Sequence, residues 1–348
     1  MDIDERYMRR AIQLAKLGAG WVSPNPMVGA VIVREGKIIG EGYHHCYGKA
    51  HAEVNAIASV FDKNLLHDAT IYVTLEPCSH YGKTPPCSEL IIKSGIPRVV
   101  VGMTDPFAKV HGRGINMLRE AGVEVVTGVL EADCRALNKH FVTAHTLHRP
   151  YVLLKWAQSR DGFMDKTRTN GGEPPVKFST SLTTVLMHRE RSHVDAIMVG
   201  ARTVALDDPS LTVRLCDCRV NPLRVVLDGR LSMPAESKLL TDGLPTVVYN
   251  RYRNCIVGNV EYVKLEHDGL LDILEDLYVR KGVTSLMVEG GASLLSQFVS
   301  AGLWDEARIE TAPFNLKCGV VAPKLNGIIE NLQFHGGNRV EFLMNGVK

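Results

Sequence analysis

The spacing of apolar and polar positions predicts alternating helices and strands over roughly the first 145 residues, as in a layered α/β domain. Residues 1–18 have the pattern of a charged amphipathic helix. Residues 27–44 contain two β-rich runs joined at Glu35-Gly36, which indicates a hairpin. Further helices are expected over 50–61, 87–95 and 114–122, and buried strands over 70–78, 98–106 and 123–129.

The same alternation starts again after Pro150, and we therefore place a domain junction in the segment 145–150. One domain is expected over 1–146 and the other over 147–348. Strands of the second domain are expected over 151–159, 194–200, 223–229, 245–250, 260–265 and 285–291, with helices over 270–282 and 292–302. This order predicts a parallel or mixed sheet covered by helices, without the Gly-x-Gly-x-x-Gly fingerprint of a Rossmann fold.

Length and charge fit a two-domain protein with a mixed surface. The 348 residues exceed what one hydrophobic core usually serves. Forty basic and 38 acidic residues leave a net charge of only +2, which argues against nucleic acid as a partner. The charged first helix differs from a signal peptide, and no run approaches the ~20 apolar residues of a membrane span. We therefore expect a cytoplasmic protein without a membrane partner.

Three residues have the types and the order of a catalytic zinc site: His51, Cys78 and Cys87. One imidazole and two thiolates leave a fourth position for water. Glu53 lies two residues beyond His51, where it can carry a proton without binding the metal. His-x-Glu followed by Pro-Cys and a second Cys is the signature of zinc nucleobase deaminases, although eight residues separate these cysteines instead of the usual two.

A closed structural zinc site, with His80 as the fourth ligand, or a chance cluster is the alternative for this motif. The other cysteines are interpreted as ordinary thiols: Cys46, Cys134, Cys216, Cys218, Cys255 and Cys318.

In the second half, the strand that ends in Glu289-Gly290-Gly291 and turns into a helix is the best candidate for a phosphate site. Free backbone N–H groups and the positive end of the helix dipole suit a phosphate or a pyrophosphate. The alternative is that the glycines only permit a positive φ.

Several segments together resemble the bifunctional diaminohydroxyphosphoribosylaminopyrimidine deaminase/reductase family, the RibD type. Those in the first half are SPNPMVGAVIV (23–33) and LEPCSHYGKTPPC (75–87). Those in the second half are KWAQSRDG (155–162), TVALDDPSLTVR (203–214) and the turn at Glu289. The resemblance covers nearly the whole chain. It implies an α/β protein with an N-terminal cytidine-deaminase-like three-layer domain and a C-terminal dihydrofolate-reductase-like α/β domain.

The resemblance also implies two consecutive steps of riboflavin biosynthesis. The first is zinc-dependent hydrolytic deamination of 2,5-diamino-6-(5-phosphoribosylamino)pyrimidin-4-one. The second is NADPH-dependent reduction of the ribosyl group of 5-amino-6-(5-phosphoribosylamino)uracil to ribityl. The partner would thus be a small pyrimidine ribose phosphate, bound by a homo-oligomeric enzyme with one zinc ion per N-terminal domain and NADPH in the C-terminal domain.

By the same resemblance, His51, Cys78 and Cys87 hold the zinc and Glu53 is the proton shuttle. The residues matched to deaminase substrate contacts are Asn25, His44 and Asp105. Those matched to the reductase substrate are Lys155, Arg191, Leu211, Arg214 and Glu289. Those matched to NADPH are Ala157, Thr203, Asp207, Gly291, Ala292, Ser293, Leu294, Leu295 and Ser296.

Two positions depart from the family's pattern. Phe107 follows Asp105-Pro106 where Asn is commoner, and Lys177 stands where many members have a Trp that can stack on the cofactor. Lys177 could instead hold a cofactor phosphate. His44 and Arg191 also have simpler interpretations, as solvated side chains of a hairpin end and of a helix face.

Two other functions fit parts of the sequence. The zinc motif alone would suit an RNA base deaminase with a second domain for RNA binding, although the near-neutral charge speaks against it. A regulator that keeps zinc structurally and senses a nucleotide is the non-enzymatic alternative.

Overall fold

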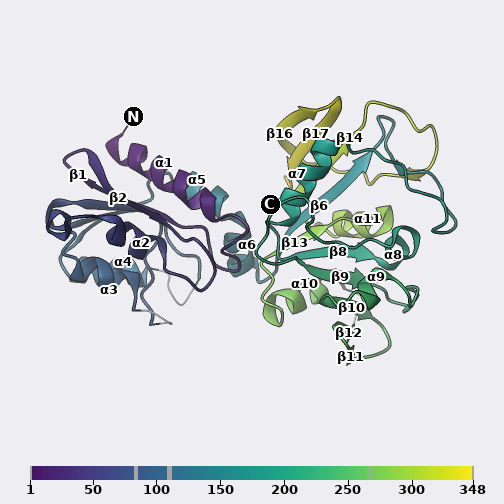
Figure 1. Ribbon diagram of the computed structural model, residues 1–348, viewed down its shortest axis with the longest axis horizontal. Helices are drawn as coiled ribbons and strands as arrows, with labels where there is room; N and C mark the ends of the chain where they lie inside the picture. The colour runs from purple at the N-terminus through teal and green to yellow at the C-terminus, as the bar shows by residue number, and fades with distance from the viewer. Residues whose placement is uncertain (1, 82–84, 108–111, 267–268, 347–348) are drawn as a thin grey trace. The chain divides into compact units, whose positions relative to one another are not determined.

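The computed structural model describes residues 2–81, 85–107, 112–266 and 269–346 (Figure 1). The chain divides into two units, Met1–Leu147 and His148–Lys348. Each unit is built around its own sheet. No helix among the described residues is long and apolar enough to cross a membrane.

The first unit contains a five-stranded sheet in the order β2-β1-β3-β4-β5. The strands are β1 (Gly29–Arg34), β2 (Lys37–Tyr43), β3 (Thr70–Leu75), β4 (Arg98–Met103) and β5 (Glu124–Thr127). β1 and β2 form the predicted hairpin, and both residues of its turn, Glu35 and Gly36, have a positive φ. β3, β4 and β5 are parallel, so their carboxyl ends lie at one edge of the sheet.

Alternating side chains of these strands build two separate cores, one on each face of the sheet. Ala30 and Ile32 pack with α2 (Ala52–Ser59), α3 (Cys87–Lys93) and α4 (Arg113–Glu120). Val31 and Val33 pack on the other face, with α1 (Ile3–Ala15) and α5 (Glu131–Leu137). The predicted three-layer arrangement is therefore confirmed. One further helix, α6 (Lys139–Leu147), ends the unit.

The second unit contains a ten-stranded sheet in the order β11-β12-β10-β9-β8-β13-β6-β14-β17-β16. Its strands are β6 (Tyr151–Gln158), β8 (Ala196–Gly200), β9 (Leu223–Leu227), β10 (Thr246–Asn250), β11 (Cys255–Val257), β12 (Val260–Lys264), β13 (Ser285–Val288), β14 (Glu306–Thr311), β16 (Ile328–His335) and β17 (Asn338–Met344). A small pair, β7 (Phe163–Asp165) and β15 (Val320–Val321), lies apart from this sheet. The strands from β12 to β14 in this order pair in parallel, whereas β11, β17 and β16 at the two edges pair antiparallel. The sheet is thus mixed and covered by helices, as the sequence predicts.

Helices cover both faces of the second sheet. α10 (Leu270–Val279) and α11 (Ala292–Ser300) pack against the core that contains Leu154 and Val288. α7 (Ser181–Arg191), α8 (Ala201–Asp207) and α9 (Lys238–Thr241) contribute to the core that contains Val199 and Met287. The predicted helices over 270–282 and 292–302 are thus confirmed within a few residues at their ends.

Candidate active sites

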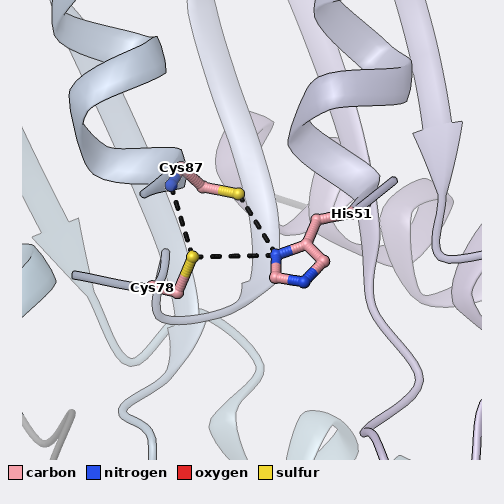
Figure 2. A group of neighbouring side chains, drawn as sticks. All are labelled: His51, Cys78 and Cys87. Carbon is pink, nitrogen blue, oxygen red and sulfur yellow. Dashed lines mark hydrogen bonds between the residues drawn. The ribbon is translucent and has the colours of Figure 1, made fainter. Parts of the chain in front are cut away.

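In the first unit, three side chains meet where a strand ends and two helices begin (Figure 2). His51 is the residue directly before α2, Cys78 follows β3, and Cys87 opens α3. The Nδ1 atom of His51 lies 3.7 Å from Sγ of Cys78 and 3.3 Å from Sγ of Cys87. All three potential ligand atoms lie within 4.8 Å of one another. The structure therefore brings the predicted ligand set together.

The chemistry of this group fits a catalytic zinc ion. A hydrogen bond from Cys87, together with the neighbouring His51, holds the pKa of Cys78 near 4, against the opposing effect of burial. The Cys78 thiolate and burial raise the pKa of Cys87, as expected when two thiols share one proton. A metal ion would replace that proton. His80 is exposed and outside this group, so the described residues offer a nitrogen and two sulfurs with a fourth position open. Residues 82–84 of the intervening loop lie outside the described residues.

Glu53 lies beside the ligands without joining them. It is in the first turn of α2, is 3% exposed, and makes a hydrogen bond with the thiol of Cys87. Burial, and then the charge of Cys78, raise the pKa of Glu53 to about 7. A carboxyl group with such a pKa can accept and release a proton near neutral pH.

Asn25 and His44 form one hydrogen-bonded unit next to His51. The amide nitrogen of Asn25 lies 3.2 Å from Nε2 of His44, and Nδ1 of His44 lies 3.0 Å from the carbonyl oxygen of Ala50. If Nδ1 carries the proton, Nε2 accepts from Asn25. The rings of His44 and His51 meet edge to face with centroids 5.5 Å apart. His44 is buried, so its interpretation as a solvated side chain is wrong.

Asp105 is also buried, two residues after the end of β4. One oxygen of its side chain accepts a hydrogen bond from the backbone N–H of Phe107, 2.8 Å away. Its backbone N–H donates to Glu76, a buried carboxylate at the end of β3 that the sequence analysis did not single out. Asp105 thus sits at the same edge of the sheet as Cys78, because β3 and β4 are parallel neighbours.

A second residue that the sequence analysis missed is Asn138, between α5 and α6. Its side-chain oxygen accepts from the backbone N–H of Met27 at 2.8 Å, and its nitrogen donates to the Met27 carbonyl oxygen at 2.9 Å. This pair of bonds fixes the backbone two residues beyond Asn25. No local motif marks such a residue, since its partner lies 111 positions away.

In the second unit, a cavity of about 610 Å³ opens where β6, β8 and β13 end. Most of the residues matched to NADPH line this cavity: Ala157, Thr203, Asp207, Gly291, Ala292, Ser293 and Leu294. Lys155 and Glu289, matched to the reductase substrate, line it as well. Residues far apart in the sequence therefore meet at one concave surface, as a cofactor site requires.

The glycine turn of this cavity has two properties that favour glycine. Gly291 has a φ of +64°, and a Cβ atom there would lie 3.2 Å from the hydroxyl oxygen of Thr203. A Cβ atom on Gly290 would lie 2.8 Å from side-chain atoms of Val199. Both interpretations made from the sequence therefore remain compatible with the structure. Gly291 has the positive φ, and the turn lines the cavity where a phosphate could bind.

Arg191 reaches the cavity through Glu289. Its Nε and Nη2 atoms each lie 2.6 Å from one carboxylate oxygen of Glu289, and its interpretation as a solvated side chain is therefore wrong. Burial would raise the pKa of Glu289, but Arg191, with Lys155, lowers it to about 2. Burial lowers the pKa of Lys155, and the charge of Glu289 opposes that shift. The site therefore contains a firmly ionised carboxylate that is paired with the guanidinium of Arg191.

Other matched residues lie outside the lining of this cavity. Leu295 packs in the core behind α11, Ser296 follows it on the same helix, and Lys177 is exposed. Leu211 is buried with a φ of +52°, a strained backbone for a leucine and a common feature of functional sites. Arg214 is exposed, and its Nη1 donates to the hydroxyl of Thr212.

Arg168 lines the cavity and was not recognised in the sequence. Its buried guanidinium pairs with Asp165 at 2.7 Å and with Asp207, and Nη1 donates to the carbonyl oxygen of Leu206 at 3.1 Å. It therefore fixes Asp207, one of the residues matched to NADPH. The sequence offered no signal for it beyond its place in a polar loop.

Comparison with known proteins identifies the family. Residues 1–103 match the cytidine and deoxycytidylate deaminase zinc-binding region, and residues 150–330 match the RibD C-terminal domain. The chain is 44% identical to the riboflavin biosynthesis protein RibD of Bacillus amyloliquefaciens, over 93% of this chain and 88% of that protein. The chain belongs to the RibD family. RibD of Escherichia coli is 36% identical over 89% of this chain and 88% of its own length.

Solved RibD structures have the same fold over the whole chain. Acinetobacter baumannii RibD superposes with a TM-score of 0.88 at 32% identity, covering 98% of each chain. A diaminohydroxyphosphoribosylaminopyrimidine deaminase/5-amino-6-(5-phosphoribosylamino)uracil reductase from Thermotoga maritima gives 0.87 at 36% identity, also over 98% of each chain. The protein is thus a bifunctional enzyme of riboflavin biosynthesis, with a zinc-dependent deaminase domain and an NADPH-dependent reductase domain. Membership of the RibD family therefore argues against both alternatives, an RNA base deaminase and a non-enzymatic regulator.

Replacing either cysteine of the zinc group should lower the zinc content of the purified protein. We expect Cys78→Ser and Cys87→Ser each to bind well under one zinc ion per chain after dialysis, because a hydroxyl is a poorer ligand than a thiolate. Metal analysis of the dialysed proteins measures the effect. Cys46→Ser is the matched control, since Cys46 belongs to the same unit but not to the group. Full zinc retention in either of the first two variants would remove that cysteine from the site.

Proposed function

We propose that the first domain, residues 1–146, deaminates 2,5-diamino-6-(5-phosphoribosylamino)pyrimidin-4-one, and that the second, residues 147–348, reduces the ribosyl group of the product to ribityl. The observation that carries the deaminase assignment is the buried carboxyl of Glu53 hydrogen-bonded to one of three clustered metal ligands. The division of the chain after Leu147 supports the proposed domain boundary. The name of the Thermotoga maritima relative supports the choice of substrates.

In the deaminase site, His51, Cys78 and Cys87 would hold the zinc ion. Zinc in such a set makes a water molecule acidic near neutral pH, so that it can attack the amino-bearing carbon of the pyrimidine. Glu53 accepts the proton of that water and returns it to the departing ammonia. Its raised pKa fits both transfers.

Asn25, His44 and Asp105 would orient the substrate in the same site. Asn25 and His44 hold each other next to His51, which places an amide and an imidazole beside the metal. His44 is neutral near pH 7, because burial lowers its pKa. The amide of Asn25 suits the polar edge of a pyrimidine, since it can both donate and accept hydrogen bonds, and His44 keeps that amide in place.

In the reductase site, bound NADPH would supply a hydride for C1′ of the opened ribosyl chain. The residues from Gly291 to Ser296, with Ala157, Thr203 and Asp207, are proposed to hold the cofactor, and all of them except Leu295 and Ser296 line the cavity. Backbone N–H groups at the start of α11 suit its phosphates. Lys177, which is exposed outside the cavity lining, is proposed as an additional contact to a cofactor phosphate.

The substrate of the reductase would lie against Lys155 and Glu289. The ionised carboxylate of Glu289 can accept hydrogen bonds from ribosyl hydroxyls, and Arg191 keeps that carboxylate in place. Lys155 and Arg214 offer cations for the phosphate. Leu211 would contact the substrate through the strained segment that it occupies.

We propose further that the enzyme works in the cytoplasm as a homo-oligomer on small-molecule substrates, without a nucleic-acid partner. The near-neutral net charge of +2 speaks against a nucleic-acid partner.

Substitution of Glu53 tests the deaminase mechanism. Glu53→Gln should keep zinc at about one ion per chain but slow ammonia release by about 10²–10⁴-fold, because the amide cannot carry the proton. Ammonia is measured with the diaminopyrimidine substrate and zinc by metal analysis. NADPH oxidation with the deaminated substrate should not change, and it serves as the control within the same preparation. Loss of zinc from this variant would contradict the role of Glu53.

Two substitutions should separate cofactor from substrate in the reductase. Gly291→Ala should raise the KM for NADPH about tenfold, because the methyl group crowds Thr203 and the cofactor phosphates. Gly302→Ala is the matched control, since Gly302 has a φ of +65° and open space around it. Glu289→Gln should instead lower kcat/KM for the deaminated substrate and leave the KM for NADPH unchanged. If both variants changed the same constant, the proposed division of the cavity would be wrong.

A further inference from the structure

Glu76 binds four backbone N–H groups through one buried carboxylate. Its Oε2 atom accepts from Asp105 at 3.2 Å and from Gly112 at 3.0 Å. Its Oε1 atom accepts from Gly114 at 3.0 Å and from Ile115 at 3.4 Å. The residue is 4% exposed. Four acceptor sites on the two oxygens match these four donors.

The position of Glu76 connects two parts of the deaminase site. It lies directly after β3 and two residues before the ligand Cys78, and its own N–H donates to the carbonyl oxygen of Met103 at the end of β4. Asp105 follows Met103 by two residues. The carboxylate therefore extends the contact between these two segments beyond Leu75 and Met103, the last paired residues of β3 and β4.

Gly114, in the first turn of α4, lies close to the backbone just before Cys78. A Cβ atom on Gly114 would lie 2.0 Å from the carbonyl oxygen of Pro77. Only glycine fits at that distance, so the first turn of α4 packs directly on the backbone that leads to Cys78. The bonds from Glu76 to Gly114 and Ile115 hold this contact.

We propose that Glu76 is a positioning residue of the deaminase, which sets where Asp105 stands relative to the zinc ligands and thereby determines substrate affinity. It acts through the backbone of Asp105 and does not touch the substrate. This inference rests on the substrate contact proposed for Asp105. In Glu76→Gln, the side chain presents an NH₂ group to two of the backbone donors, so two of the four bonds are replaced by repulsive contacts.

The test is steady-state kinetics of ammonia release by Glu76→Gln in the full-length, zinc-loaded protein. We expect the KM for the diaminopyrimidine substrate to rise about tenfold to a hundredfold, since small displacements of a binding group have effects of that size. Zinc content should stay at about one ion per chain. NADPH oxidation with the deaminated substrate should be unchanged, which shows that the protein is intact.

Asp4→Asn is the matched control for loss of a buried carboxylate. Asp4 bonds to Arg98 and Tyr72 in the same domain, where Arg98 begins β4 and so lies at the opposite end of that strand from Asp105. This variant should lower the melting temperature without changing the KM. If Glu76→Gln also leaves the KM unchanged, Glu76 is only a structural residue and the inference is wrong. Loss of zinc from Glu76→Gln would contradict the inference as well.

Gly114→Ala provides a second route to the same displacement, and it decides the question if Glu76→Gln does not fold. A raised KM with zinc retained supports the inference, and an unchanged KM contradicts it. Asp105→Asn distinguishes the proposed substrate contact of Asp105 from the positioning role of Glu76. If it leaves the KM unchanged, the proposed substrate contact of Asp105 fails, and the inference fails with it. If it raises the KM and Glu76→Gln does not, only the inference about Glu76 is wrong.

Discussion

The parallel pairing of buried strands determines where both active sites can lie. β3 and β4 run side by side in the first domain, as β6, β8 and β13 do in the second, so their carboxyl ends open at one edge of each sheet. Apolar side chains of these strands fill the cores, and the polar groups of the first site gather beyond the last paired residues of β3 and β4. Cys78 and Asp105 follow two such strands, and Glu289 follows a third.

Beyond these strand ends, the backbone needs other partners, and buried polar side chains supply them. Glu76 accepts a hydrogen bond from the segment after β4, and Asn138 accepts one from the segment after Asn25. Arg168 donates to Asp207 at the end of α8. Leaving such a buried donor or acceptor unpaired would cost about 1–3 kcal/mol. Substitution of Glu76, Asn138 or Arg168 should therefore disturb the segments that carry the proposed ligand contacts.

The sequence predicted the elements whose apolar positions alternate cleanly, and it predicted that His51, Cys78 and Cys87 come together, because a metal site fixes residue type and order. Among the strands it missed are β14, where Arg308 and Glu310 are charged and yet buried, and β16, whose side chains are largely exposed on both faces. Neither strand shows the alternation of a half-buried strand. Glu76 and Asn138 were missed because their partners are backbone groups distant in the sequence. Leu295 and Ser296 were matched to NADPH from the run of residues after Gly291, but Leu295 packs in the core because a helix directs successive side chains to different faces.

The central claim is that one chain carries two chemistries at two separate sites, used in a fixed order. The most direct test supplies the diaminopyrimidine ribose phosphate with and without NADPH, and follows ammonia and NADPH separately. Two separate sites predict one ammonia per substrate without NADPH, NADPH oxidation only after a lag set by ammonia release, and no effect of chelators when the deaminated substrate is supplied. NADPH oxidation without prior ammonia release, or ammonia release that requires NADPH, would contradict it.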